Sequence, residues 1–114
     1  MLTSGDVLDL DLGPPVAQEA GFVRPAVLMT AQTILAGSPN VVHVVPLTTT
    51  SRGFSSEVLI EPDRHNGLEN TSVAQCQHVR AVASARIGGV RGNVGPLILA
   101  QIRESVGLIL DIPA

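Results

Sequence analysis

Two residues of this 114-residue chain stand out for the chemistry that they could do together: Arg24, which precedes Pro25, and Thr48. Arg24 stands at the start of one apolar segment and Thr48 at the end of the next. Sequential strands of a small sheet usually neighbour one another, so the two residues share one edge if their strands are antiparallel. Such a pair suits a phosphate group, because the cation neutralises its negative charge and the hydroxyl donates a hydrogen bond to one of its oxygens. The alternative to a phosphate site is that residues 41–52 are simply a buried strand that ends in a polar turn.

Other kinds of site find little support in the sequence. It contains no GxGxxG, P-loop, CxxC or HExxH pattern, and its three histidines and one cysteine show no metal-ligand spacing. We therefore expect no metal and no cofactor. Asp9 and Asp11 could form a carboxylate pair, but a solvated strand face explains them better. Cys76 could be a reactive thiol, but its apolar surroundings favour a small buried side chain.

Composition and charge limit the classes of protein to which the chain can belong. It has 45% hydrophobic residues and a mean hydropathy of +0.35, which predicts one globular domain over residues 1–114. No apolar run is long enough for a membrane span, no signal peptide is visible, and the lone cysteine fits the cytoplasm. The net charge of −3 disfavours general binding of nucleic acid, yet all seven cations are arginines, so a local arginine patch stays open.

Short strands separated by turn residues dominate the expected secondary structure. Alternation or branched apolar runs predict strands at 5–12, 26–30, 41–45 and 55–61, and one long or two short strands over 71–83. Pro46 is expected to end the pairing of the central strand. The glycines at 88, 89 and 92 are expected to break the strand pattern after residue 83. Residues 31–40 are expected to form a short helical turn or loop. Apolar residues at helical spacing between Pro96 and Pro113 predict a C-terminal helix.

The fold class that this pattern favours is mainly β (α+β), a small barrel or sandwich of five to seven strands with a C-terminal helix. His43 interrupts the central strand, and we interpret it as a core or interface histidine rather than a catalytic one. His65 is expected to be exposed. His78 lies beside Gln77 and Arg80 where a strand turns polar, which suggests either a binding surface or a solvated strand face.

The chain resembles the MazF/PemK toxins of bacterial toxin–antitoxin systems over nearly its whole length. The resemblance rests on four stretches and on the order "G-D…D-L-x-P…E…R-P" followed by "P-L-T-T". The stretches are GDVLDLDLGPP, QEAGFVRPAVLM, VVHVVPLTTTSRGFSSEVLIEP and NGLENTSVAQCQHVRAV. The tail from residue 86 resembles the C-terminal strand and helix of actinobacterial members. The resemblance implies a small SH3-like β-barrel with a C-terminal helix, which forms a homodimer.

The activity that the resemblance implies is metal-independent, sequence-specific cleavage of single-stranded RNA to 2′,3′-cyclic phosphate and 5′-hydroxyl ends. It places the catalytic arginine on Arg24 and the catalytic threonine on Thr48, and Glu19 is the best carboxylate candidate. It also implies an antitoxin whose acidic tail blocks the RNA groove. The expected RNA contacts are Gln18, Thr49, Thr50, Arg52, Gln77, His78 and Arg80.

Two other functions stay open at this point. One is a protein-binding toxin similar to the gyrase-directed CcdB poisons, which use the surface of the C-terminal helix and lack the Arg–Thr pair. The other is a catalytically silent homologue that only binds an antitoxin.

Overall fold

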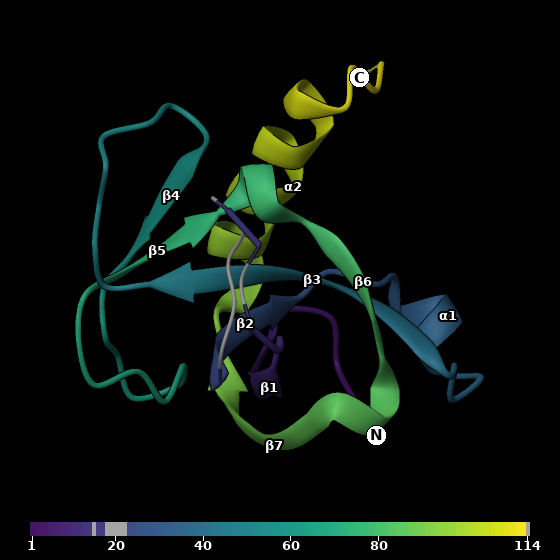
Figure 1. The fold of residues 1–114 in the computed structure, drawn as a ribbon. Coiled ribbons are helices and arrows are strands. Elements are labelled where there is room, and N and C mark those ends of the chain that lie inside the picture. The colour runs from purple at the N-terminus through teal and green to yellow at the C-terminus, as the bar shows by residue number, and fades with distance from the viewer. Residues whose placement is uncertain (15, 18–22, 114) are drawn as a thin grey trace.

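The computed structural model describes residues 1–14, 16–17 and 23–113, a part of the chain in which seven strands precede a C-terminal helix (Figure 1). The strands are β1 (Asp6–Asp11), β2 (Val23–Leu28), β3 (Val41–Thr48), β4 (Glu57–Ile60), β5 (Ser72–Gln75), β6 (Arg80–Ala83) and β7 (Ile87–Asn93). The helices are α1 (Gln32–Leu35) and α2 (Gly95–Ile109), with short 3-10 turns η1 (Cys76–His78) and η2 (Ser84–Arg86). The predicted mainly β fold with a C-terminal helix is confirmed.

The strands form one bent, antiparallel sheet in the order β4-β5-β3-β2-β1-β7. Strand β3 is its centre, because β2 pairs along one side while β6 and β5 divide the other side between them. The sheet curls without closing between β4 and β7 in the described part of the chain, which gives a barrel-like body (Figure 1).

Strand alternation builds an apolar core on each face of this sheet. Neighbouring residues of β1, Val7 and Leu8, both have no exposed surface, yet they belong to different cores. The core with Val7 lies under α2, which contributes Leu99 and Ile102. The core with Leu8 fills the curl of the sheet, where Leu35 of α1 joins it. Strands β1, β2 and β3 are therefore held from both sides.

Helix α2 follows the predicted boundaries closely. Pro96 lies in the first turn, where the missing N–H costs no helical hydrogen bond, and the helix continues through Gly107 to Ile109. No helix in the described residues is long and apolar enough to cross a membrane.

Two local expectations for β3 were wrong, and a third, for His43, is narrowed to one of its two alternatives. Pro46 does not end the strand, which continues to Thr48. The partner of β3 changes there from β6, paired through Val44, to β5, paired from Leu47, so a residue without an N–H is tolerated. The first half of β3 is also not fully buried, because Val41 is 50% exposed. His43 is exposed and cannot be a core histidine.

The glycines after residue 83 do not break the strand pattern, so this expectation was also wrong. Residues 87–93 form β7, which pairs with β1 across two irregularities in register. A Cβ on Gly92 would lie 2.2 Å from the carbonyl oxygen of His65. A Cβ on Gly67 would lie 2.4 Å from the carbonyl oxygen of Arg91. The glycines let the loop 63–68 dock directly on β7, where Asn66 is 1% exposed.

The two expectations left open for residues 71–83 are now resolved. The segment forms two short strands, β5 and β6, which η1 separates. Cys76, at the start of η1, has no exposed surface, as the sequence indicated. Burial raises the pKa of its thiol, and the hydrogen bond to Ser105 on α2 only partly opposes this effect. Cys76 is therefore a neutral core residue at pH 7.

Candidate active site

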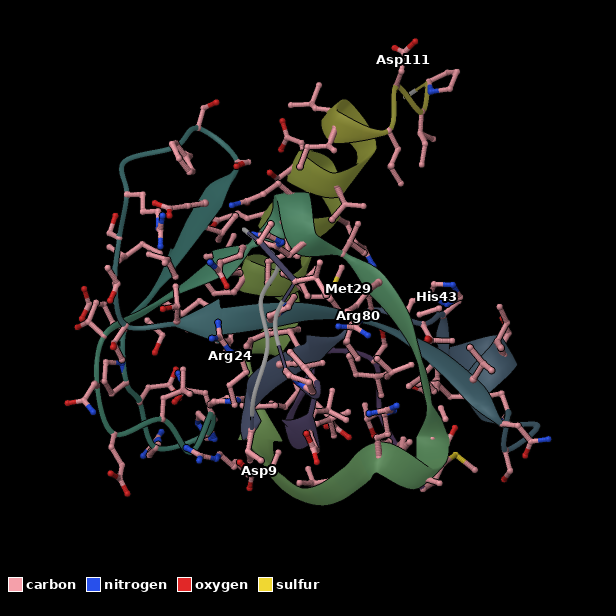
Figure 2. All side chains as sticks on the ribbon, in the orientation of Figure 1. Asp9, Arg24, Met29, His43, Arg80 and Asp111 are labelled. Carbon is pink, nitrogen blue, oxygen red and sulfur yellow. The ribbon has the colours of Figure 1, made fainter. Side chains whose placement is uncertain are left out.

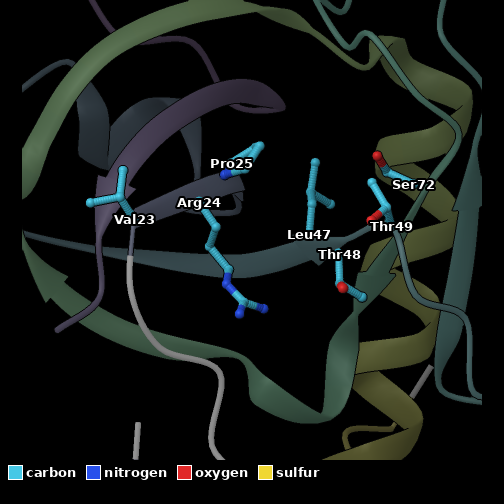
Figure 3. Close-up of a pocket in the computed structure, with 7 residues that line it drawn as sticks. All are labelled: Val23, Arg24, Pro25, Leu47, Thr48, Thr49 and Ser72. Atoms are coloured by element: carbon cyan, nitrogen blue, oxygen red, sulfur yellow. The ribbon is translucent and has the colours of Figure 1, made fainter. Parts of the chain in front are cut away.

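Arg24 and Thr48 come together at one edge of the β2–β3 ladder. The observed register pairs Ala26 with Pro46 in antiparallel strands, and its continuation sets Arg24 opposite Thr48. Figure 3 shows both side chains on one face of the strands, whereas Pro25 and Leu47 extend from the other face, as a period of two requires. The sequence-based expectation that the two residues share an edge is confirmed.

A pocket of about 390 Å³ lies at this edge. Its lining is mostly apolar strand surface with polar side-chain ends at its rim, and both Arg24 and Thr48 contribute to it (Figure 3). The lining residues are Val23, Arg24, Pro25, Leu47, Thr48, Thr49 and Ser72. Because the two strands are packed on both faces, the guanidinium and the hydroxyl start from fixed backbone positions.

The guanidinium of Arg24 is anchored by a third strand. Its Nη1 donates a hydrogen bond of 3.2 Å to Oε1 of Gln75, the last residue of β5. Gln75 is 7% exposed, whereas Arg24 is half-buried. The contact joins residues 51 positions apart in the sequence, and it fixes one nitrogen of the cation inside the protein.

The hydroxyl of Thr48 forms a local turn. Its Oγ1 accepts a hydrogen bond of 3.2 Å from the backbone N–H of Thr50. The oxygen acts as the acceptor in this bond, so the O–H proton can be donated to another group. Thr48 therefore offers a directed donor to an oxygen held in the pocket.

The loop after β3 is organised by the carboxylate of Glu57. This carboxylate accepts hydrogen bonds from the hydroxyl of Ser51 at 3.0 Å, the N–H of Arg52 at 3.1 Å and the N–H of Gly53 at 3.1 Å. Partial removal of water alone would raise the pKa of Glu57, but the bonds from Arg52, Ser51 and Gly53 together lower it below the ordinary value of 4.5. Glu57 is therefore ionised at neutral pH and keeps the loop folded, with the Arg52 side chain exposed.

The other predicted RNA contacts lie at different places. Thr49 lines the pocket and Thr50 is exposed beside it. Gln77 accepts a hydrogen bond of 2.9 Å from the hydroxyl of Ser56, and it lies with His78 in η1. Arg80 begins β6 opposite Val44, and Figure 2 shows it over the middle of the sheet. Gln77, His78 and Arg80 are partly exposed, whereas Thr49 and Thr50 are exposed. Gln18 and Glu19 lie outside the described residues.

Sequence reasoning missed Gln75 and Glu57. Alternation marked Glu57 only as a polar strand residue, and Gln75 fell in a segment interpreted as apolar. A buried amide in such a segment is itself a signal, because buried polar groups need partners. No group of three or more histidine, cysteine, aspartate or glutamate residues in the described ranges could hold a metal ion.

Comparison with known proteins identifies the family. Residues 3–110 match the family model for the PemK-like, MazF-like toxin of type II toxin–antitoxin systems. The endoribonuclease MazF9 of Mycobacterium tuberculosis is 30% identical over 98% of both chains. The endoribonuclease toxin MazF of Escherichia coli is 28% identical over 93% of this chain and 91% of its own.

Solved structures support the same fold. MazF from Deinococcus radiodurans superposes with a TM-score of 0.81 at 23% identity, with 96% of each chain covered. A mycobacterial endoribonuclease in complex with its cognate antitoxin gives 0.80 at 21% identity and covers 100% of this chain and 99% of its own.

The chain belongs to the PemK-like, MazF-like toxins of type II toxin–antitoxin systems. The matches do not favour the gyrase-directed alternative.

Proposed function

We propose that this chain is an endoribonuclease toxin that cleaves single-stranded RNA in the pocket between Arg24 and Thr48. The observation that carries the proposal is the opposition of a guanidinium and a hydroxyl across the β2–β3 ladder, at the rim of one pocket. Relatives that align over nearly the whole chain are named endoribonucleases, which supports the assignment.

The reaction that suits this pair is an internal transesterification of RNA. The 2′-hydroxyl oxygen forms a bond to the adjacent phosphorus, and the bond from phosphorus to the 5′-oxygen breaks. The leaving 5′-oxygen takes up a proton from water, so the products are a 2′,3′-cyclic phosphate and a 5′-hydroxyl. Arg24 neutralises the charge that develops on the phosphate, and Thr48 donates a hydrogen bond to a non-bridging oxygen. Glu19 is the proposed acceptor of the 2′-hydroxyl proton, on the strength of the sequence alone.

Residues of the loop after β3 and of the turn η1 supply most of the proposed contacts to bases. Thr49 and Thr50 directly follow Thr48, and the loop held by Glu57 carries Arg52. Gln18, Gln77, His78 and Arg80 complete the proposed set. Unpaired RNA exposes base edges that amides, hydroxyls and guanidinium groups can read.

A homodimer is part of the proposal. The first half of β3 and its partner β6 present an exposed, weakly polar face in which Val41 pairs with Ala83 and His43 with Ala81. This face lies at the α1 end of β3, whereas Arg24 lies toward the other end (Figure 2). We propose that a second copy covers it, with His43 as an interface residue, and light scattering of the pure protein would give twice the mass of the chain.

A cognate antitoxin is the second proposed partner. Neighbouring structures include an endoribonuclease with its cognate antitoxin and a MazE–MazF pair, which supports this inference. An acidic segment that lies over Arg24 and Arg52 would block the proposed RNA path.

The test is cleavage of a mixed-sequence single-stranded RNA in EDTA by the pure protein, with the new ends mapped. We expect cuts at a short motif that leave 5′-hydroxyl ends. Arg24→Ala should reduce the rate by about 10²–10³-fold or more, the usual effect of losing one preorganised group. Arg64→Ala is the matched control, because this exposed arginine contacts only the neighbouring His65 among the bonds described. No cleavage by folded wild-type protein would refute the proposal and favour the silent homologue.

A further inference from the structure

Gln75 is the residue whose role the proposed reaction does not yet explain. It is a polar side chain, 7% exposed, at the end of a strand in which all four residues are buried. Burial of an amide is costly unless its polar atoms are paired. Its oxygen meets Nη1 of Arg24 at 3.2 Å. The chain therefore keeps a buried amide where it touches the cation of the proposed site.

We propose that Gln75 is a positioning residue that holds the Arg24 guanidinium in the orientation needed to meet the scissile phosphate. This inference rests on the proposed function. Gln75 acts through Arg24, from the strand β5, and does not itself contact the RNA.

The geometry explains why such a residue is useful. An arginine side chain has several rotatable bonds, and holding it in one conformation costs conformational entropy. Strand β2 fixes the backbone of Arg24, but it leaves the end of the side chain to be placed. Strand β5 pairs with β3 through Leu47 and Thr48, so Gln75 is anchored to the strand that carries the hydroxyl. One hydrogen bond thus relates the guanidinium to Thr48.

The chemistry also favours an amide over a carboxylate at this position. A carboxylate next to Arg24 would form an ion pair and cancel part of the positive charge that the phosphate needs. An amide oxygen accepts the same hydrogen bond and carries no net charge. Gln75 therefore orients the cation without adding a negative charge of its own beside it.

The test uses an RNA oligonucleotide that carries the motif mapped for the wild-type enzyme. Gln75→Met keeps the length of the side chain and removes the acceptor. We expect kcat to fall by about 10- to 100-fold, the range for a hydrogen bond to a charged group. We expect KM to rise by a smaller factor, because the guanidinium also holds the bound phosphate, and the thermal midpoint to stay near that of a matched Gln→Met control. The control is Gln32→Met on the exposed α1 turn, which removes the bonds of the Gln32 amide to the N–H of Ser4 and to the carbonyl oxygen of Leu2.

A double-mutant cycle separates positioning from a structural role or a direct contact with RNA. Binding is measured with the same oligonucleotide carrying a 2′-deoxy sugar at the cleaved position, which cannot react. Gln75→Met should weaken binding when Arg24 is present and have no further effect in Arg24→Ala. If Gln75→Met does not fold, Gln75→Asn serves instead, because it keeps an amide but is one methylene too short to reach Nη1.

Each outcome decides the question. If the wild type cleaves and Arg24→Ala does not, but Gln75→Met keeps the wild-type kcat, the positioning role is wrong and the proposed function stands. Equal weakening of binding with and without Arg24 also overturns the positioning role. If the folded wild type does not cleave RNA, both proposals fail.

Discussion

Substitution of Gly92 by alanine should destabilise the fold strongly, because the docking of loop 63–68 on β7 depends on the absence of a side chain there. A Cβ at this position would lie 2.2 Å from the carbonyl oxygen of His65 and 2.8 Å from the carbonyl carbon of Asn66. Both are backbone atoms, so no side-chain rotation relieves the overlap. The loop and the strand must separate, which breaks the 2.8 Å bond from the N–H of Asn93 to His65.

The expected loss of stability is the sum of the steric overlap and the broken hydrogen bond. Overpacking costs about 1–3 kcal/mol, and loss of one backbone hydrogen bond adds about 1 kcal/mol, so the free energy of unfolding should fall by about 2–4 kcal/mol. For a chain of this size the thermal midpoint should drop by about 8–16 °C. Exposure of Asn66, whose side chain makes bonds to Glu61, Asp63 and Leu68, would add to this effect.

Gly89→Ala is the matched control for this prediction. Gly89 lies on the same strand, and a Cβ there meets nothing within 4 Å. Thermal and urea unfolding of the two variants and the wild type should be compared at one protein concentration, because dimerisation would make the midpoint depend on it. If Gly92→Ala loses no more stability than Gly89→Ala, the close approach of the loop to β7 does not exist.

Two further predictions concern titrating groups. The pKa of Glu57 is lower in the folded protein, so its bonds hold the loop 51–53 at pH values above the ordinary 4.5 and are lost as the pH falls through the lower value. Amide resonances of Arg52 and Gly53 should therefore shift on acidification before the rest of the sheet does, and unchanged resonances would contradict this role of Glu57. The pKa of Cys76 is raised by burial, so its thiol should resist iodoacetamide in the native protein at pH 8 and react once urea unfolds the chain. Rapid modification of the native protein would show that the thiol is not buried.

The fold could be predicted from the sequence where each residue's environment follows from its neighbours. Leu8 and Leu10 alternate with Asp9, and β1 has the expected position with those leucines buried. The helical spacing after Pro96 likewise gave α2. The errors came where a distant segment decides the outcome. Pro46 lies where β3 changes partners, and Gly92 lies under a loop that no local pattern connects to it.

The candidate site divides in the same way. Arg24 and Thr48 could be related from the sequence, because they occupy the two ends of consecutive antiparallel strands. Gln75 could not be assigned to Arg24, since the partners are 51 residues apart and alternation does not say which polar groups meet. The role of Glu57 could not be predicted either. Its carboxylate accepts bonds from backbone N–H groups, which nearly every residue has, so the residue types in the loop do not reveal the contact.

The two apolar cores described above also bear on which parts of the domain can tolerate substitution. The strands that bear Arg24 and Thr48 are packed between these cores, whereas residues 51–53 lie outside the sheet and their bonds run to one carboxylate, that of Glu57. Substitutions at residues 51–53 are therefore expected to alter the proposed RNA recognition while the proposed cleavage groups keep their positions in the sheet.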